Sequence, residues 1–174
     1  MFGINLLSTP TLFATVLATA ILFMAVAWLL RTTFRRAASA LIAAAPLVLL
    51  VMGIDSVAGQ AGWWRYPAVP VGHAPLAWYI ASAIGYGAAV GLVGWRVLRR
   101  YGARSLVWFA LCVGLFGLAR DYAYSVSAHL IEFGRGPLPL VADFCSYAVA
   151  AVIVQGIMWG VAGPPRSDPL ARRR

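Results

Sequence analysis

The chain has 174 residues, of which 62% are hydrophobic and only 11% are charged. A soluble domain would carry roughly 25% charged residues, so this composition indicates an integral membrane protein. The formal charge is +9, but most of the basic residues, all of them arginine, lie in short clusters between apolar segments. That pattern is typical of loops that orient a membrane protein, and it argues against a nucleic-acid partner, which requires a folded basic surface.

Five apolar segments are each long enough to cross a bilayer as a helix of about 20 residues. They predict an all-α membrane helix bundle, a single transmembrane domain over residues 1–163, with spans at 10–30, 37–57, 75–97, 105–127 and 138–161. No basic segment precedes the first span, so we interpret it as a retained helix and not as a signal peptide. Two ends stay open for the fourth helix, one near Ser127 and one at Phe133. Residues 164–174 are expected to form a disordered basic cytoplasmic tail.

The arginines predict the orientation of the five spans. One side of the membrane would hold Arg31, Arg35, Arg36, Arg96, Arg99, Arg100, Arg104 and the four arginines of the tail, and the other side only Arg65 and Arg135. Because cytoplasmic loops carry the excess of positive charge, we expect a multi-pass protein of the cell membrane with its N-terminus outside and its C-terminus inside.

Small and weakly polar residues within the spans predict helix packing. Gly87 and Gly91 form a small-xxx-small pattern, which indicates close packing either inside the bundle or between protomers of a homo-oligomer. Gln155 is expected to make an interhelical hydrogen bond. Cys112 and Cys145 lie inside apolar spans, and we expect them to be buried small residues.

A polar and aromatic loop over residues 58–74 follows the second span. It contains Trp63, Trp64, Arg65 and Tyr66, and Trp78 lies just beyond it. Two interpretations stay open for these rings. They are anchors at the membrane surface, or they contact a substrate.

Four ionisable residues are expected at one depth in the membrane, just under its outer surface. A helix rises about 1.5 Å per residue, and this rise places Asp55, Arg120, Asp121 and Asp143 at nearly the same level. His73 begins the third span close by. Ionisable residues in a membrane usually face the bundle interior in pairs. Arg120 could pair with Asp143 or Asp55 and simply hold the helices together, while Asp121 could face the outer water.

Three carboxyls beside one cation leave an excess of acidic residues. Desolvation and like-charge repulsion disfavour the state in which all three carboxyls are ionised. Arg65 would partly offset this excess if the loop folds inward. A carboxyl that keeps its proton can act as a general acid. Tyrosines lie nearby in the sequence: Tyr122 beside Asp121, Tyr124 four residues after Arg120, and Tyr147 four residues after Asp143.

One stretch reads Asp55-xxx-Gly59-xx-Gly62-Trp63-x-Arg65-Tyr66 and then Gly72-x-x-Pro75-Leu76-x-Trp78. It resembles the small integral membrane cyclases and hydratases of isoprenoid metabolism, namely the lycopene-cyclase-domain type, the carotenoid hydratase type and the related membrane terpenoid cyclases. The resemblance covers about 25 residues and implies that Asp55 is the early acid of that group. The lycopene-cyclase type carries a carboxylate pair after the proline, where this chain has Leu76-Ala77-Trp78, so Asp121 and Asp143 would supply the second acid.

These observations predict a cofactor-independent cyclase or isomerase that uses carboxyl acid–base chemistry on a lipophilic polyene, epoxide, terpenoid or polyketide. Asp55 and Asp143 are the expected acid and base, Arg120 and Asp121 would set the charge, and His73 is a further candidate. The expected substrate contacts are Trp63, Trp64, Arg65, Tyr66, Trp78, Tyr122, Tyr124 and Tyr147. The aromatic faces of Trp63, Trp64, Tyr66, Tyr122 and Tyr124 would stabilise a cation. With only two histidines in the chain, no metal site is expected. The alternative is a non-enzymatic transporter subunit or partner-binding scaffold.

Overall fold

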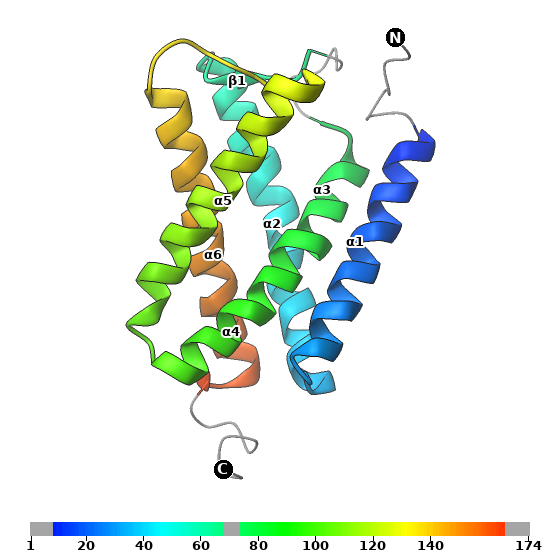
Figure 1. Cartoon of the computed structure of the whole chain (residues 1–174), viewed down its shortest axis with the longest axis vertical. Coiled ribbons are helices and arrows are strands. Elements are labelled where there is room, and N and C mark those ends of the chain that lie inside the picture. The colour runs from blue at the N-terminus through cyan, green and yellow to red at the C-terminus, as the bar shows by residue number, and fades with distance from the viewer. Residues whose placement is uncertain (1–8, 68–73, 166–174) are drawn as a thin grey trace.

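The computed structural model describes residues 9–67 and 74–165, and within them five helical segments are long and apolar enough to cross a membrane. The chain is therefore all-helical with the architecture of a multi-pass membrane protein. The segments are α1 (Thr9–Leu29), α2 (Phe34–Gln60), a third segment made of α3 (Leu76–Ser82), η1 (Ala83–Ala88) and α4 (Ala89–Tyr101), then α5 (Ser105–Ala128) and α6 (Leu138–Ala162) (Figure 1). Each lies within a few residues of its predicted range.

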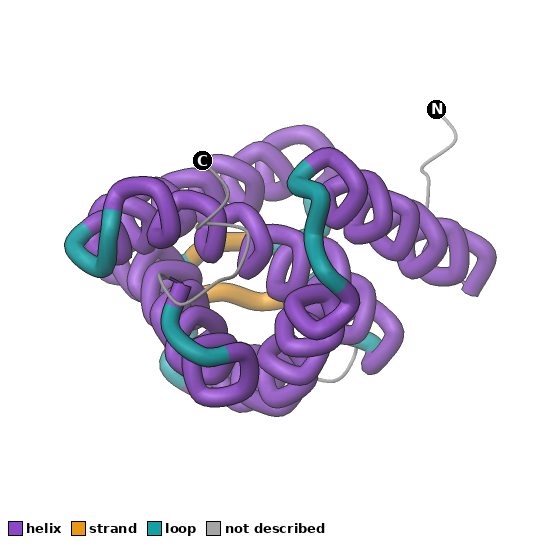
Figure 2. The backbone as a smooth tube through the Cα atoms, turned by 90° about the horizontal axis from the view of Figure 1, so that it is seen from below, coloured by secondary structure: helices purple, strands orange, loops and turns teal. Residues whose placement is uncertain are grey.

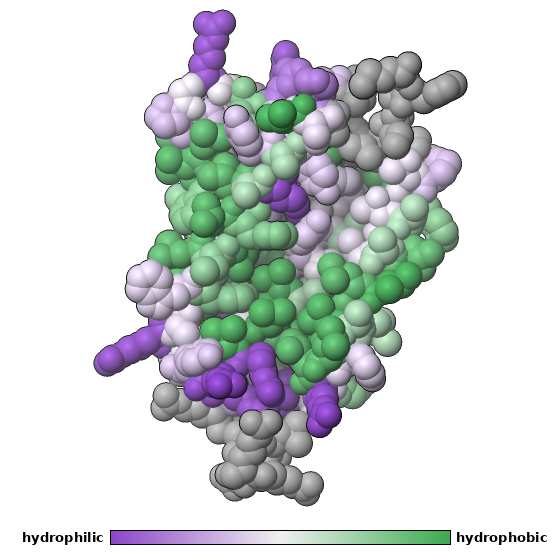
Figure 3. Space-filling view, viewed as in Figure 1, coloured by the Kyte–Doolittle hydropathy of each residue, from purple (hydrophilic) through white to green (hydrophobic). Residues whose placement is uncertain are grey.

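The surface of the bundle is apolar between two hydrophilic ends (Figure 3). Large apolar side chains such as Trp28, Leu49, Trp108 and Leu115 are exposed around its circumference, as expected for helices whose outer faces meet lipid. We call the end that carries Arg31, Arg35, Arg36, Arg96, Arg99, Arg100 and Arg104 the arginine end. The opposite end, where the loops after α2 and α5 meet, is the lid end.

Four of the five segments form a ring, and α1 lies outside it (Figure 2). The ring consists of α2, the third segment, α5 and α6, while α1 packs on the outer side of the third segment. Glycines allow close approach inside the ring: a Cβ on Gly87 would collide with Leu47, and one on Gly91 would collide with Val154. The small-xxx-small pattern is thus used within the chain. Whether the chain also forms oligomers stays a prediction.

The third segment changes its helical geometry in the middle. Residues Ala83–Ala88 form a π-helix between two α-helices. Such insertions add a residue to the turn and often occur at functional sites. Here the insertion lies in the part of the segment that faces the centre of the ring, next to the cavity described below.

A small β-sheet closes the lid end. Strand β1 (Trp64–Arg65) pairs antiparallel with β2 (Glu132–Phe133), with Trp64 opposite Phe133. Viewed along the bundle, the strands cross behind the opening of the helix ring (Figure 2). The fourth span ends close to its predicted end at residue 127, and the longer alternative to Phe133 is wrong: α5 ends at Ala128, and His129 adopts a left-handed conformation with φ 49° that turns the chain into the lid. We use "lid" for residues 61–67 and 129–137.

Cys112 and Cys145 do not lie in the core. Both are exposed on the outer faces of α5 and α6. The prediction that they are buried was wrong, because membrane helices are apolar on their lipid-facing sides as well as inside, so hydrophobic surroundings in the sequence do not indicate burial. The arginine-rich residues 166–174, most of the predicted tail, lie outside the described residues.

Candidate functional site

The helix ring encloses a narrow cavity of about 110 Å³, counted as the space open to the centre of a water molecule. One water requires roughly 10–15 Å³ on this scale, so the cavity has room for several waters or for part of a lipid chain. Its lining comes from α2, the third segment, α5, α6 and the lid, with nothing from α1. Asp55, Arg120, Asp121 and Asp143 all line it, so the structure brings together the four ionisable residues that the depth argument placed at one level.

Asp55 is the centre of a hydrogen-bonded cluster under the lid. Its Oδ1 accepts a bond from the Trp64 indole N–H at 3.0 Å, and its Oδ2 accepts bonds from the hydroxyls of Tyr66 at 3.0 Å and Tyr79 at 2.5 Å. The Tyr79 hydroxyl in turn accepts the Ala74 backbone N–H at 3.0 Å. One carboxyl therefore joins α2, the lid and the start of α3, and both of its oxygens are engaged.

Tyr66, one of the donors to Asp55, is held in its protonated form. Burial raises the pKa of the Tyr66 hydroxyl well above its ordinary value, and the nearby Asp55 carboxyl acts in the same direction. Tyr66 is therefore a permanent donor near neutral pH. With three donors on its two oxygens, Asp55 is arranged as an acceptor that positions the lid over the cavity.

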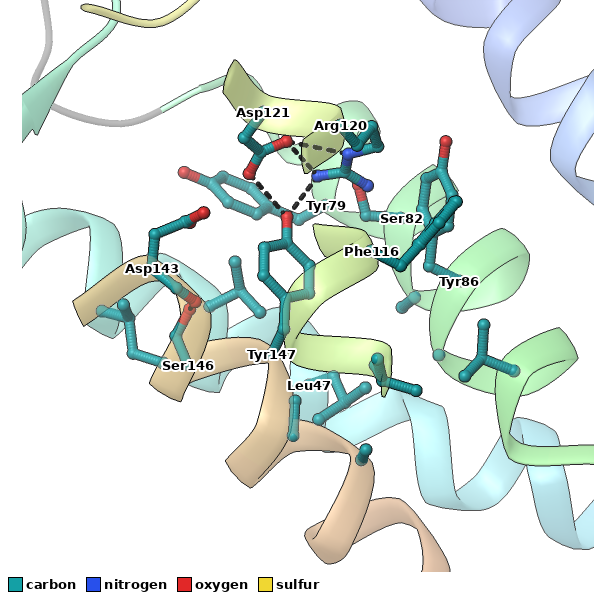
Figure 4. Close-up of a pocket in the computed structure, with 18 of the residues that line it drawn as sticks. Leu47, Tyr79, Ser82, Tyr86, Phe116, Arg120, Asp121, Asp143, Ser146 and Tyr147 are labelled. Carbon is teal, nitrogen blue, oxygen red and sulfur yellow. Dashed lines mark hydrogen bonds and ion pairs between the residues drawn. The ribbon is translucent and has the colours of Figure 1, made fainter. Parts of the chain in front are cut away.

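A second cluster joins α5 to α6. Arg120 donates from Nε to Asp121 Oδ1 at 2.8 Å, and its terminal nitrogen lies 2.6 Å from the same oxygen. The Tyr147 hydroxyl accepts a bond from Arg120 and donates to Asp121 Oδ2 at 2.7 Å (Figure 4). The guanidinium also lies 4.4 Å from the centre of the Tyr86 ring, a favourable cation–π distance.

The pairing within this cluster differs from both predicted alternatives. Arg120 pairs with its sequence neighbour Asp121 and not with Asp143 or Asp55. Asp121 is buried and does not face the outer water. Its carboxylate and the Arg120 guanidinium largely cancel each other's charge, so the acidic excess of the cavity rests on Asp55 and Asp143.

Asp143 differs from Asp55 and Asp121 because one of its carboxyl oxygens has no hydrogen-bond donor among the described residues. Its side chain is 3% exposed, and it points toward the end of the cavity where Asp121 and Tyr79 lie (Figure 4). Within the described chain its Oδ2 is buried and has no hydrogen-bond partner. Leaving a buried carboxylate oxygen unpaired is costly, and groups in this condition frequently serve a function.

Two rows of side chains face each other between the third segment and α5. Trp78 stacks edge-on against Tyr124 with ring centres 6.5 Å apart, and Tyr86 meets Phe116 at 6.4 Å. Arg120 lies midway between Phe116 and Tyr124 along α5. We call these four rings the aromatic seam. They line the cavity, and none of them is fully buried.

The seam joins α5 to α3 and η1, two elements that do not pack closely against it as helices. The main helix contacts of α5 are with α6 and α4, and α3 and η1 are not among them. A hydrophilic patch interrupts the apolar surface between α5 and α3 (Figure 3), and 14% of the Arg120 side chain is exposed. The lid closes the neighbouring end with Trp64, Leu130 and Ile131, all of which are buried.

Not all predicted site residues reach the cavity. Trp64, Tyr66, Trp78, Tyr124 and Tyr147 line it. Tyr122 is 56% exposed on the outer side of α5, and Trp63 packs inside the lid. Arg65 does not fold inward: it forms an exposed ion pair with Glu132 at 2.6 Å. His73 lies outside the described residues.

Several lining residues of the third segment were not among the predicted site residues. Tyr79, Ser82 and Tyr86 all line the cavity, at spacings of three and four that place them on one helical face. A polar stripe within an otherwise apolar helix marks the side that faces the bundle interior, and this signal was available in the sequence. Gln155 makes the predicted interhelical bond, from Nε2 to the Gly91 carbonyl at 2.8 Å.

No protein-family model, curated protein or solved structure matches this chain. The resemblance to isoprenoid cyclases and hydratases therefore rests on the residues quoted above. Within residues 9–67 and 74–165, no three side chains of histidine, cysteine, aspartate or glutamate are grouped so as to hold a metal ion.

Proposed function

We propose that this chain is a multi-pass enzyme of the cell membrane that cyclises or isomerises a lipophilic polyene, epoxide, terpenoid or polyketide by proton transfer. The observation that carries the proposal is the Asp143 carboxyl, buried with an unpartnered oxygen on the wall of an aromatic and apolar cavity. Since a buried, unpaired carboxyl is less costly neutral than ionised, it suits the role of a general acid. The six motif positions from Asp55 to Tyr66 that resemble the isoprenoid cyclases agree with this chemistry by resemblance only.

The reaction on a polyene is written as follows. The Asp143 carboxylic acid transfers its proton to one carbon of a double bond, whose electron pair forms the new C–H bond and leaves a cation on the neighbouring carbon. A second double bond of the same chain attacks this cation and forms a C–C bond. Loss of a proton from an adjacent carbon to the Asp143 carboxylate then re-forms a double bond. The product is an isomer of the substrate, and the acid is regenerated.

The remaining residues of the cavity support this reaction in different ways. The faces of Trp64, Trp78 and the tyrosines stabilise the cation through their negative quadrupoles. Asp55, held by three donors, adds a fixed negative charge and positions the lid. Arg120 and Asp121 hold Tyr147 in place. The narrow cavity restricts the conformations of the chain and brings the reacting carbons together.

We further propose that the lid end faces outward and that the substrate enters from the bilayer through the aromatic seam. The arginine end then lies in the cytoplasm, which satisfies the positive-inside rule and places the N-terminus outside. The lid closes the aqueous route with paired strands, whereas the seam is held by contacts between side chains. A lipophilic substrate is already concentrated in the bilayer, so a lateral route suits it.

The test of the proposed reaction is Asp143→Asn in a deletion strain of the source organism. The matched control is Glu132→Gln, the same chemical change at an exposed residue outside the cavity. Lipid extracts are compared by liquid chromatography and mass spectrometry for two isomers of equal mass. Because general acid catalysis contributes about 10²–10⁴-fold, Asp143→Asn is expected to accumulate the linear isomer, while the control behaves as wild type. In D₂O the cyclic product of a polyene gains one carbon-bound deuterium when the Asp143 acid exchanges its proton with solvent between turnovers.

Membrane levels and thermal unfolding of both variants show whether they are folded. Full turnover by a folded Asp143→Asn variant would refute the assignment. The ionisable cluster would then be a structural ion-pair network, as expected for a non-enzymatic scaffold or transporter subunit.

A further inference from the structure

The cavity has a second polar end, far from the ionisable residues. One face of α6 lines it continuously through Asp143, Ser146, Tyr147, Ala150, Ala151, Val154 and Gln155. Asp143 and Gln155 are twelve residues apart on this helix, which corresponds to about 18 Å along its axis. Between them the opposite walls include the apolar side chains of Leu47, Val90 and Val113 as well as Ser82 and Tyr86. We call this lining from Asp143 to Gln155 the sleeve; its mostly apolar walls suit one lipid chain.

Gln155 lies at the end of the sleeve opposite Asp143. Its side chain is 1% exposed, and its Nε2 donates to the Gly91 carbonyl at 2.8 Å. Because a carbonyl can only accept, this bond determines which end of the amide is the oxygen. Oε1 is buried and has no hydrogen-bond partner within the described chain. An unsatisfied buried acceptor costs about 1–3 kcal/mol, so a ligand that donates to it gains affinity.

The buried, unpartnered acceptor oxygens point to a ligand that spans both ends of the sleeve. Among the described residues, the buried side-chain oxygens without a partner belong to Asp143 and Gln155. Both residues line the same cavity. The lining next to Gln155, formed by Gly91, Phe109 and Val154, carries no charge. An ionised group would be costly there, whereas a neutral hydroxyl can both donate a hydrogen bond and be desolvated at a modest cost.

We infer that Gln155 binds the hydroxyl group of a linear lipid alcohol, whose chain runs along α6 and whose distal double bond lies beside Asp143. The position of the double bond rests on the proposed function; the hydroxyl site does not. The substrate class is thus a polyene alcohol of isoprenoid type, about 18 Å from hydroxyl to reacting carbon by the helical rise. Gln155 is a substrate-specificity residue that sets how deep the chain enters.

The test measures equilibrium binding of two probes, radiolabelled geranylgeraniol and its methyl ether, to the full-length protein in detergent. The ether has the same chain but cannot donate a hydrogen bond. Wild type is expected to bind the alcohol about tenfold more tightly, which is about 1.4 kcal/mol. Gln155→Met, similar in length and without the acceptor, is expected to reduce this preference to less than about twofold, with ether binding unchanged, as the loss of one hydrogen bond predicts. Asp143→Asn is expected to retain the preference.

Three results would overturn the inference: no binding of either probe, no preference in wild type, or a preference lost in Asp143→Asn but kept in Gln155→Met. The last would place the hydroxyl at the lid end. A photoreactive group beside the hydroxyl provides a check in the unmodified protein, with labelling expected around Ala151 and Phe109 and not around Tyr79 and Tyr124. Turnover of Asp143→Asn decides the proposed reaction separately, since none of these binding measurements depends on catalysis.

Discussion

Gly117 lies on α5 directly against the Tyr147 ring of α6, and a Cβ at this position would overlap that ring. Gly117→Ala therefore has to displace Tyr147, whose hydroxyl joins Arg120 to Asp121. Gly156→Ala is the matched control, because nothing lies within 4 Å of a Cβ on Gly156. The same change of residue thus probes one crowded and one open site, and the α-helical preference for alanine contributes equally to both.

The expected difference follows from two costs that only Gly117→Ala carries. Overpacking typically costs about 1–3 kcal/mol, and weakening one hydrogen bond to a charged group costs about 1.5–3 kcal/mol. The two variants should therefore differ by about 2.5–6 kcal/mol in the free energy of unfolding, as the sum of these costs. Gly156→Ala alone should be neutral or up to about 1 kcal/mol more stable than wild type.

Reversible unfolding in mixed detergent and SDS micelles measures this difference. A second comparison places both alanines in a Tyr147→Ala background, where the ring is gone and Gly117→Ala should cost little. The coupling between positions 117 and 147 should then exceed about 1 kcal/mol, as expected for residues in contact. If Gly117→Ala is as stable as Gly156→Ala, or if the cost at position 117 persists without the Tyr147 ring, the close α5–α6 contact described above is wrong.

Two further predictions concern charge and access. Arg120→Gln leaves the buried Asp121 carboxylate without its cation and should lower the free energy of unfolding by about 3–5 kcal/mol. Arg65→Ala breaks an exposed ion pair with Glu132 and should change the free energy of unfolding by less than about 1 kcal/mol. SDS titration measures both variants, and equal effects would contradict the conclusion that the Arg120–Asp121 pair is buried and the Arg65–Glu132 pair is exposed. In a background without native cysteines, a cleavable thiol crosslink between Trp78→Cys and Tyr124→Cys should slow geranylgeraniol binding until it is cleaved. The same crosslink between Arg65→Cys and Glu132→Cys should have no effect, and the reverse pattern would place the route through the lid.

For the ionisable residues, the sequence predicted their position in the site but not their partners. The common depth of Asp55, Arg120, Asp121 and Asp143 followed from the rise of a helix, and all four line one cavity. Their partners could not be predicted from the helical rise, because a pairing depends on the rotation of each helix about its own axis. That rotation directs Arg120 to Asp121 and Tyr147 and leaves Asp143 without a partner for one oxygen.

For the aromatic residues of the loop and spans, too, the sequence predicted the location but not which side chains line the cavity. Their abundance near one membrane surface was readable, but Trp64 and Trp63 are adjacent and only Trp64 lines the cavity. Trp63 lies just before strand β1, and within the strand the alternation of side chains makes Trp64 buried and Arg65 exposed. The strand exists because it pairs with residues 132–133. A partner strand of two residues has no hydrophobic period to detect, so β2 was not predicted and helix as far as Phe133 stayed open as an alternative.

The spans, their ends and the clustering of arginines were determined by the sequence alone, because the length of an apolar segment and the rise of a helix are local properties of the backbone. Tertiary structure decided that α1 stands outside the ring, that the Gly87 and Gly91 pair packs inside the chain, and that α6 lines the cavity from Asp143 to Gln155. These features depend on which helix faces fit together. In a chain whose lipid-facing and interior residues are equally apolar, that fit is not visible in composition or hydrophobic period.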